Sequence, residues 1–186
     1  MCQKKNPDFK LKLITLNIES NSSKYEVNYE YKQKIKELFE ELKKRNLRLS
    51  AAESLTGGLF SASITSVPGA SSVFVGANVT YANDAKEALG VKQETLDKYG
   101  AVSQETAKEM AISVGDYHKT DVSVSFTGNA GPDAMEGKPV GEVYIGIKIK
   151  DNIKVYKLQL DGDRQKIREQ CVNFAIKKLY DEVKVL

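Results

Sequence analysis

The residues with the clearest potential for chemistry lie in the stretch AAESLTGG, residues 51–58. An apolar run over residues 47–52 leads into Ser54, and a helical pattern follows over residues 58–66. A hydroxyl at a strand-to-helix junction lies beside the unpaired N–H groups of the first helical turn, which can stabilise an oxyanion or bind a phosphate. The simpler alternative is that Ser54 or Thr56 only caps the helix, and spacing alone favours the cap.

A serine hydroxyl is a poor nucleophile until a base takes its proton. The single histidine, His118, lies in a polar run and is expected to be a solvated loop residue. Lys86 and Tyr81 lie five positions apart across a second predicted strand-to-helix turn. Burial or a second cation would lower the pKa of Lys86 and make it a usable base. Taken singly, Lys86 is more simply explained as a surface lysine, and Tyr81 as an aromatic residue packed on a strand.

Two arginines, Arg164 and Arg168, begin the last predicted helix, where cations are not favoured. Their guanidinium groups either bind an anion or pair with Asp161 or Asp163, and the sequence leaves both alternatives open. Glu53 is similarly ambiguous, because it could pair with Lys86 and keep that lysine charged. Neither a P-loop nor a G-x-G-x-x-G motif is present, so the sequence predicts no triphosphate or Rossmann dinucleotide site.

Composition excludes several classes of protein. The 186 residues are 28% charged and 41% hydrophobic, with a net charge of +3, as expected for one globular domain. The net charge is small and the basic residues are scattered among acidic ones, so we expect no nucleic-acid partner. Two distant cysteines and one histidine predict neither a disulfide framework nor a metal site. No apolar run reaches the roughly 20 residues that span a membrane, and Lys10 and Lys12 interrupt any signal peptide, which favours a cytoplasmic location.

Helical and strand patterns alternate along the chain and must position these residues. Helices are predicted over residues 29–45, 58–66, 83–89, 93–99, 103–117 and 163–183, and strands over 47–52, 73–81, 122–126, 141–150 and 153–160. Asn83 and Ser103 are predicted helix caps, and Asp151-Asn152 a two-residue hairpin turn. The alternation predicts an α/β fold with a mixed sheet and helices on both faces.

Residues 1–28 differ from the rest and are expected to form an extension, which could be an added strand, an oligomer arm or a tail. Residues 29–186 then form the single domain. Polar loops at residues 53–58, 81–86 and 127–133 each follow a predicted strand. If those three strands are parallel neighbours, the loops converge on one crevice at the carboxyl edge of the sheet.

A series of short motifs resembles the CinA C-terminal domain family over roughly residues 30–183. The motifs are AESLTGG (52–58), PGAS (68–71), VTYANDAK (79–86), LGV (89–91), GAVS (100–103), TGNAGP (127–132), KPVG (138–141) and GDR (162–164). The resemblance implies a three-layer α/β/α sandwich, a homo-oligomer, and neither metal nor cofactor. Better-characterised members hydrolyse nicotinamide mononucleotide to nicotinate mononucleotide and ammonia, which implies a pyridine nucleotide as the partner and a role in its recycling.

The resemblance also assigns roles to residues. It implies that Ser54 is the nucleophile, that Tyr81 and Lys86 activate it, and that Arg164 binds substrate. The residues implied to line the pocket are Thr56, Gly57, Gly58, Thr127, Gly128 and Asn129. Asn129 stands where many members carry Ile or Val, and loop 133–137 lacks their double glycine, so we expect an effect on substrate fine-specificity.

The alternative function is a non-catalytic nucleotide-binding or regulatory domain. The presence of Ser54, Tyr81 and Lys86 together favours an enzyme, because a pure binding domain has no need of all three. The physiological substrate stays open among nicotinamide nucleotides and related amides.

Overall fold

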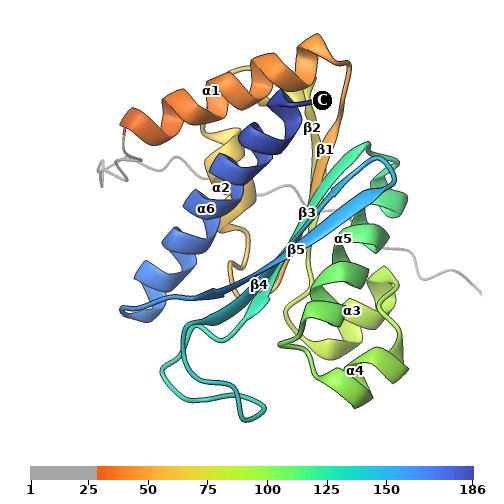
Figure 1. Ribbon diagram of the computed structural model, residues 1–186, viewed down its shortest axis with the longest axis vertical. Helices are drawn as coiled ribbons and strands as arrows, with labels where there is room; N and C mark the ends of the chain where they lie inside the picture. Colours follow the sequence, from red (N-terminus) through yellow and green to blue (C-terminus); the bar gives the residue numbers. More distant parts are fainter. Residues whose placement is uncertain (1–28) are drawn as a thin grey trace, which may run out of the picture.

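The computed structural model describes residues 29–186; the predicted extension, residues 1–28, lies outside the described residues. A five-stranded sheet lies between two layers of helices (Figure 1). The predicted three-layer α/β/α sandwich with a mixed sheet is therefore confirmed.

The strand order places the three predicted loops at one edge of the sheet. The strands are β1 (Leu49–Glu53), β2 (Phe74–Val79), β3 (Val122–Gly128), β4 (Glu142–Ile149) and β5 (Asn152–Gln159), in the spatial order β2-β1-β3-β4-β5. β1 is parallel to both β2 and β3, whereas β4 is antiparallel to β3 and β5. The carboxyl ends of three adjacent parallel strands therefore meet, as the crevice requires.

Helices cover both faces of the sheet. One face carries α1 (Tyr29–Lys44), α2 (Leu59–Thr65) and α6 (Arg164–Lys184), and the other carries α5 (Gln104–His118), against which α3 (Asn83–Leu89) and α4 (Gln93–Tyr99) pack (Figure 1). Because β1 is covered on both faces, all five of its residues are buried. The site thus rests on a strand that has little freedom to move.

Local details differ from the sequence predictions in three places. Ala82, not Asn83, is the N-cap of α3, whereas Ser103 caps α5 as predicted, with its side chain accepting from the Thr106 N–H. Ile149 pairs with Asn152, so the hairpin turn lies one residue earlier than predicted. The prediction for His118 was also wrong, because a polar run need not be a loop.

His118 ends α5 and is half-buried against β2, where its ring lies 2.9 Å from the Asn78 amide oxygen. Gly76 leaves room for the ring, since a Cβ at that position would lie 3.0 Å from the imidazole. The histidine therefore packs two elements together and lies outside the predicted catalytic group.

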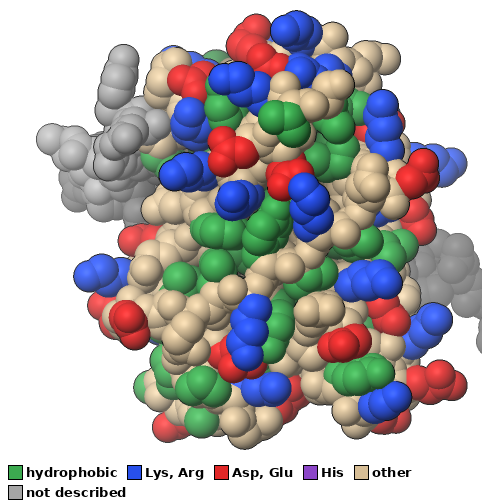
Figure 2. All heavy atoms as spheres, in the orientation of Figure 1, with side chains coloured by type: hydrophobic (Ala, Val, Ile, Leu, Met, Phe, Trp, Pro, Cys, Tyr) green, Lys and Arg blue, Asp and Glu red, His purple; other side chains and the backbone are tan. Residues whose placement is uncertain are grey.

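The face shown in Figure 2 carries basic and acidic side chains side by side, with no continuous patch of one sign. Such a surface does not favour a polyanionic partner at this face. Among the described helices, none combines the length and apolar character needed to cross a bilayer.

Candidate active site

Two predicted residues from distant parts of the sequence meet at the carboxyl edge of the sheet. Ser54 directly follows β1, and Lys86 lies in α3, the helix after β2. The Lys86 Nζ lies 3.3 Å from the Ser54 Oγ. Ser54 is 8% exposed and Lys86 only 1%. The explanation of Lys86 as a surface residue was therefore wrong, and the pair forms a buried serine–lysine dyad.

Two backbone carbonyls fix the position of the Lys86 amine. Its Nζ donates to the Thr80 carbonyl at 3.0 Å and to the Tyr81 carbonyl at 3.3 Å. Burial lowers the pKa of Lys86, and the negative charge of Glu136 partly opposes that effect. The structure thus holds a lysine whose neutral form is more accessible than in water, directed at a serine hydroxyl.

Glu53, the residue before Ser54, binds the first turn of α2 through its side chain. Its carboxylate accepts from the N–H groups of Gly58, Phe60 and Ser61 at 2.9–3.1 Å and from the Ser61 hydroxyl at 2.5 Å. The fully buried charge is therefore stabilised by the first turn of the helix.

This arrangement corrects three expectations. The N–H groups at the start of α2 are not free for a phosphate or an oxyanion. The N-cap position is Gly58 in a left-handed conformation (φ 97°), so neither Ser54 nor Thr56 is the cap. The Glu53 carboxylate bonds to α2, so it is not the partner of the Lys86 amine.

The turn after Ser54 keeps two other donors available. Among residues 29–186, no acceptor pairs with the N–H groups of Leu55 and Thr56. Arg168 of α6 holds this turn from behind, donating to the Leu55 carbonyl at 3.1 Å and the Thr56 carbonyl at 2.7 Å. Because Arg168 binds the carbonyls of Leu55 and Thr56, the turn is held in place. The N–H groups of the same two residues follow the nucleophile directly in the chain.

Arg168 was expected to bind an anion or an aspartate, and the structure instead engages it with backbone carbonyls. No local signal in the sequence identifies this role, because the two ends of the contact lie 112–113 residues apart. The adjacent Thr56 hydroxyl is buried and has no hydrogen-bond partner within the described chain.

Tyr81 and Arg164 form a second pair at the rim. The Arg164 guanidinium donates to the Tyr81 hydroxyl at 2.7 Å and to the Gly131 carbonyl at 2.7 Å. Tyr81 is 60% exposed, so it is not the packed strand aromatic of the simpler explanation. The contact between Tyr81 and the dyad is its backbone carbonyl on Lys86; activation of Ser54 by its hydroxyl stays a prediction.

The end of β3 supplies the remaining predicted pocket residues. Thr127 donates its hydroxyl to the Ala101 carbonyl at 2.6 Å, and Gly128 leaves room for β4, since a Cβ would lie 2.7 Å from the Val143 Cα. The Asn129 side chain is buried and donates to the carbonyls of Asp133 and Lys138.

The Asn129 amide oxygen also accepts from the Gly131 N–H at 2.9 Å. All of these side-chain contacts lie within the loop between β3 and β4, residues 129–141, which we call the site loop. Asn129 therefore organises the site loop, and a direct contact of its side chain with substrate stays a prediction.

Sequence reasoning missed Glu136. Its carboxylate accepts from the Ala101 and Val102 N–H groups, both at 3.0 Å, and connects the site loop to the segment before α5. A carboxylate in a polar loop gives no sequence signal for this contact, which depends on how the loop folds back.

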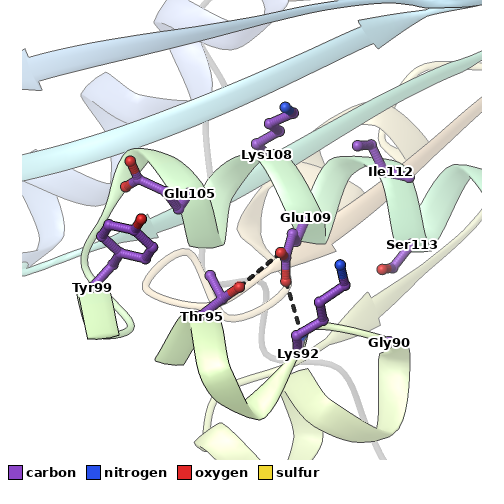
Figure 3. A pocket seen from close by; sticks show the side chains of 9 residues that line it. All are labelled: Gly90, Lys92, Thr95, Tyr99, Glu105, Lys108, Glu109, Ile112 and Ser113. Carbon is purple, nitrogen blue, oxygen red and sulfur yellow. Dashed lines mark hydrogen bonds between the residues drawn. The ribbon is translucent and has the colours of Figure 1, made fainter. Parts of the chain in front are cut away.

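A separate hollow of about 400 Å³ lies between α4 and α5 (Figure 3). Glu109 lines it and is already bonded to the Lys92 N–H and the Thr95 hydroxyl, and none of the predicted site residues lies there. The described residues also contain no cluster of three or more His, Cys, Asp or Glu side chains that could hold a metal. The dyad at the sheet edge is therefore the strongest candidate for chemistry.

Comparisons with known proteins bear on the family and the fold of the chain. The sequence profile of the CinA C-terminal domain matches residues 31–183. A putative competence-damage inducible protein of Limosilactobacillus reuteri is 48% identical over 153 residues, which cover 80% of this chain and 37% of that protein. The chain thus spans little more than a third of the length of such relatives. Their names state no enzymatic activity.

Solved structures share the fold over nearly their whole length. The competence/damage inducible protein CihA from Agrobacterium tumefaciens is 35% identical with a TM-score of 0.78, and the match covers 82% of this chain and 94% of that one. A CinA superfamily protein from Klebsiella pneumoniae is 27% identical with a TM-score of 0.81, covering 84% and 99%.

Proposed function

The chain belongs to the CinA C-terminal domain family, and on that premise we propose that it is an amidohydrolase that converts nicotinamide mononucleotide to nicotinate mononucleotide and ammonia. The observation that carries the proposal is the buried contact of 3.3 Å between Ser54 Oγ and Lys86 Nζ. A pure binding site has no need of a desolvated amine directed at a hydroxyl, whereas acyl transfer requires a base at this position.

The neutral form of Lys86 fits its surroundings. A neutral amine has two N–H groups and one lone pair, and the carbonyls of Thr80 and Tyr81 take the two N–H groups. The Nζ then has its lone pair for the Ser54 hydroxyl, which in the protonated amine instead accepts the third N–H. Burial supplies the driving force, because it disfavours the charged amine.

The reaction proceeds by two acyl transfers. Lys86 takes the Ser54 proton as Oγ attacks the carboxamide carbon, and the tetrahedral oxyanion forms. Its collapse breaks the C–N bond, and protonated Lys86 gives its proton to the departing amide nitrogen, which leaves as ammonia. Water then attacks the acyl-enzyme with Lys86 again as the base, and the proton returns to Ser54 as nicotinate mononucleotide leaves.

The N–H groups of Leu55 and Thr56 are suited to stabilise the oxyanion, because they follow the nucleophile directly and lack acceptors within residues 29–186. One well-directed donor of this kind contributes about 3–4 kcal/mol to the transition state. Arg168 fixes the turn that presents them.

Arg164 and Tyr81 have the exposure expected of residues that orient the nucleotide. Arg164 is well shaped to bind the 5′-phosphate of the substrate, with Tyr81 as its neighbour at the rim. The homo-oligomer and the cytoplasmic location expected from the sequence are part of the same proposal.

The test is ammonia release from nicotinamide mononucleotide by the purified protein, with Ser54→Ala in parallel. Release that disappears in the variant supports both the activity and the nucleophile. Tight nucleotide binding without release at high protein concentration would instead favour the non-catalytic domain.

A further inference from the structure

The tip of the site loop is held against the segment before α5 by one carboxylate. Within residues 29–186, the hydrogen bonds that join the tip, residues 134–137, to segments outside the site loop are the two that Glu136 accepts from Ala101 and Val102. The carbonyl of Ala101 is in turn held by the Thr127 hydroxyl. The contact therefore fastens a long loop to the segment before α5, which the Thr127 hydroxyl already holds in place.

We propose that Glu136 is a positioning residue of the active site, a latch whose carboxylate closes the site loop against Ala101 and Val102 and holds a negative charge toward Lys86. The inference rests on the proposed function, in which Lys86 is the base. The latch couples the position of the site loop to the position of the Glu136 charge. When the loop is closed, both are next to the site, and when it is open, neither is.

Three charged groups on the elements around the site are engaged elsewhere. On the β1 side, Glu53 is bound by α2; on α5, Glu109 accepts from Lys92 and Thr95; and Arg164 of α6 is bonded to Tyr81 and Gly131 at the rim.

Glu136 is the charge that acts on Lys86, and it raises the pKa that burial lowers. Loss of the Glu136 charge must therefore lower the pKa of Lys86 further, because a carboxylate favours the protonated amine. The acid limb of the activity profile would then move to lower pH.

The decisive variant is Glu136→Gln, which nearly preserves shape, removes the charge and leaves one acceptor for the two N–H groups. Asp133→Asn is the matched control: it removes the same charge from the same loop, and the contact of Asp133 with Asn129 uses only the backbone carbonyl. Lys86 is titrated by NMR in free protein carrying ¹³C at lysine Cε, with its signal assigned by its loss in Lys86→Met. The pH profile of kcat/KM and the value of KM for nicotinamide mononucleotide are measured alongside.

We expect Glu136→Gln to lower the titration midpoint of Lys86 and to move the acid limb of the kcat/KM profile to lower pH. It should also raise KM several-fold as the loop loosens. Asp133→Asn should change none of these three properties. An unchanged Lys86 midpoint in folded Glu136→Gln, or an equal shift in Asp133→Asn, would overturn the latch. If the NMR shift appears in a protein that releases no ammonia, the latch stands and the proposed function falls.

If Glu136→Gln does not fold, Glu136→Asp is the second variant, which keeps the charge but shortens the side chain. A raised KM, from a loosened loop, supports the latch, and an unchanged KM contradicts it.

Discussion

Two polar pairs face the site, and they differ in burial more than in contact geometry. The inner pair, Ser54 and Lys86, is 8% and 1% exposed, with its polar atoms 3.3 Å apart. The rim pair, Tyr81 and Arg164, has its contact at 2.7 Å, and Tyr81 is 60% exposed. The shorter contact is therefore the one that solvent screens.

This difference in burial assigns chemistry to the inner pair and substrate recognition to the rim pair. Removing water from an amine changes its protonation equilibrium, whereas a guanidinium keeps its charge in either environment. The inner pair consequently gains a reactive base from its burial. The exposed rim pair keeps a charge and a hydroxyl accessible to a nucleotide, so changes there should act mainly on binding.

The largest effect should come from Ser54→Ala. Without Oγ no acyl-enzyme can form, and losses of nucleophiles in comparable enzymes reach about 10⁴-fold or more in kcat. The measurement is ammonia release under single-turnover conditions, with nucleotide binding by calorimetry as the control for an intact site. Turnover near the wild-type level would remove Ser54 from the mechanism.

A somewhat smaller loss is expected for Lys86→Met, about 10²–10⁴-fold in kcat, which is the usual contribution of a general base. Lys86→Arg separates charge from basicity, since arginine stays protonated. We expect both variants to lose activity to this extent while still binding nucleotide. An active Lys86→Arg would show that the position supplies a positive charge rather than a base.

The order of the elements made this inner pair a candidate from the sequence, although Ser54 and Lys86 taken singly favoured a helix cap and a surface lysine, and their catalytic roles came from the family resemblance. Alternating helices and strands placed three loops after three parallel strands, and Ser54 and Lys86 lie at the first two of those loops. The role of Glu53 was predictable in principle, because its donors lie only five to eight residues away at a helix start. The contacts of Arg168 and Glu136 were not, since they join segments far apart and depend on the final packing of loops.

Changes at the rim should be milder and should separate binding from chemistry. Tyr81→Phe removes the hydroxyl that accepts from Arg164 at an exposed site. If this hydroxyl acts in binding and not in activating Ser54, KM should rise about tenfold or less with kcat within a few-fold. Arg164→Gln should raise KM more, because it also removes the charge. A large loss of kcat with unchanged KM in Tyr81→Phe would instead place its hydroxyl in the proton transfers at Ser54.

The smallest expected effect is on stability, and it tests burial of Lys86 without any substrate. Burial lowers the pKa of Lys86 below that of the unfolded chain, so between the two values the unfolded state binds more protons. The free energy of unfolding should therefore rise with pH through that window, because the unfolded state progressively loses the proton that the folded state has already released. Lys86→Met lacks this group, so the stability difference between wild type and variant should shift toward the wild type as pH increases. Urea unfolding at a series of alkaline pH values measures the difference, with Lys108→Met as a control from the solvent-facing side of α5. A stability difference between wild type and Lys86→Met that does not depend on pH would mean that Lys86 titrates alike in the folded and unfolded states. Burial would then give the inner pair no reactive base.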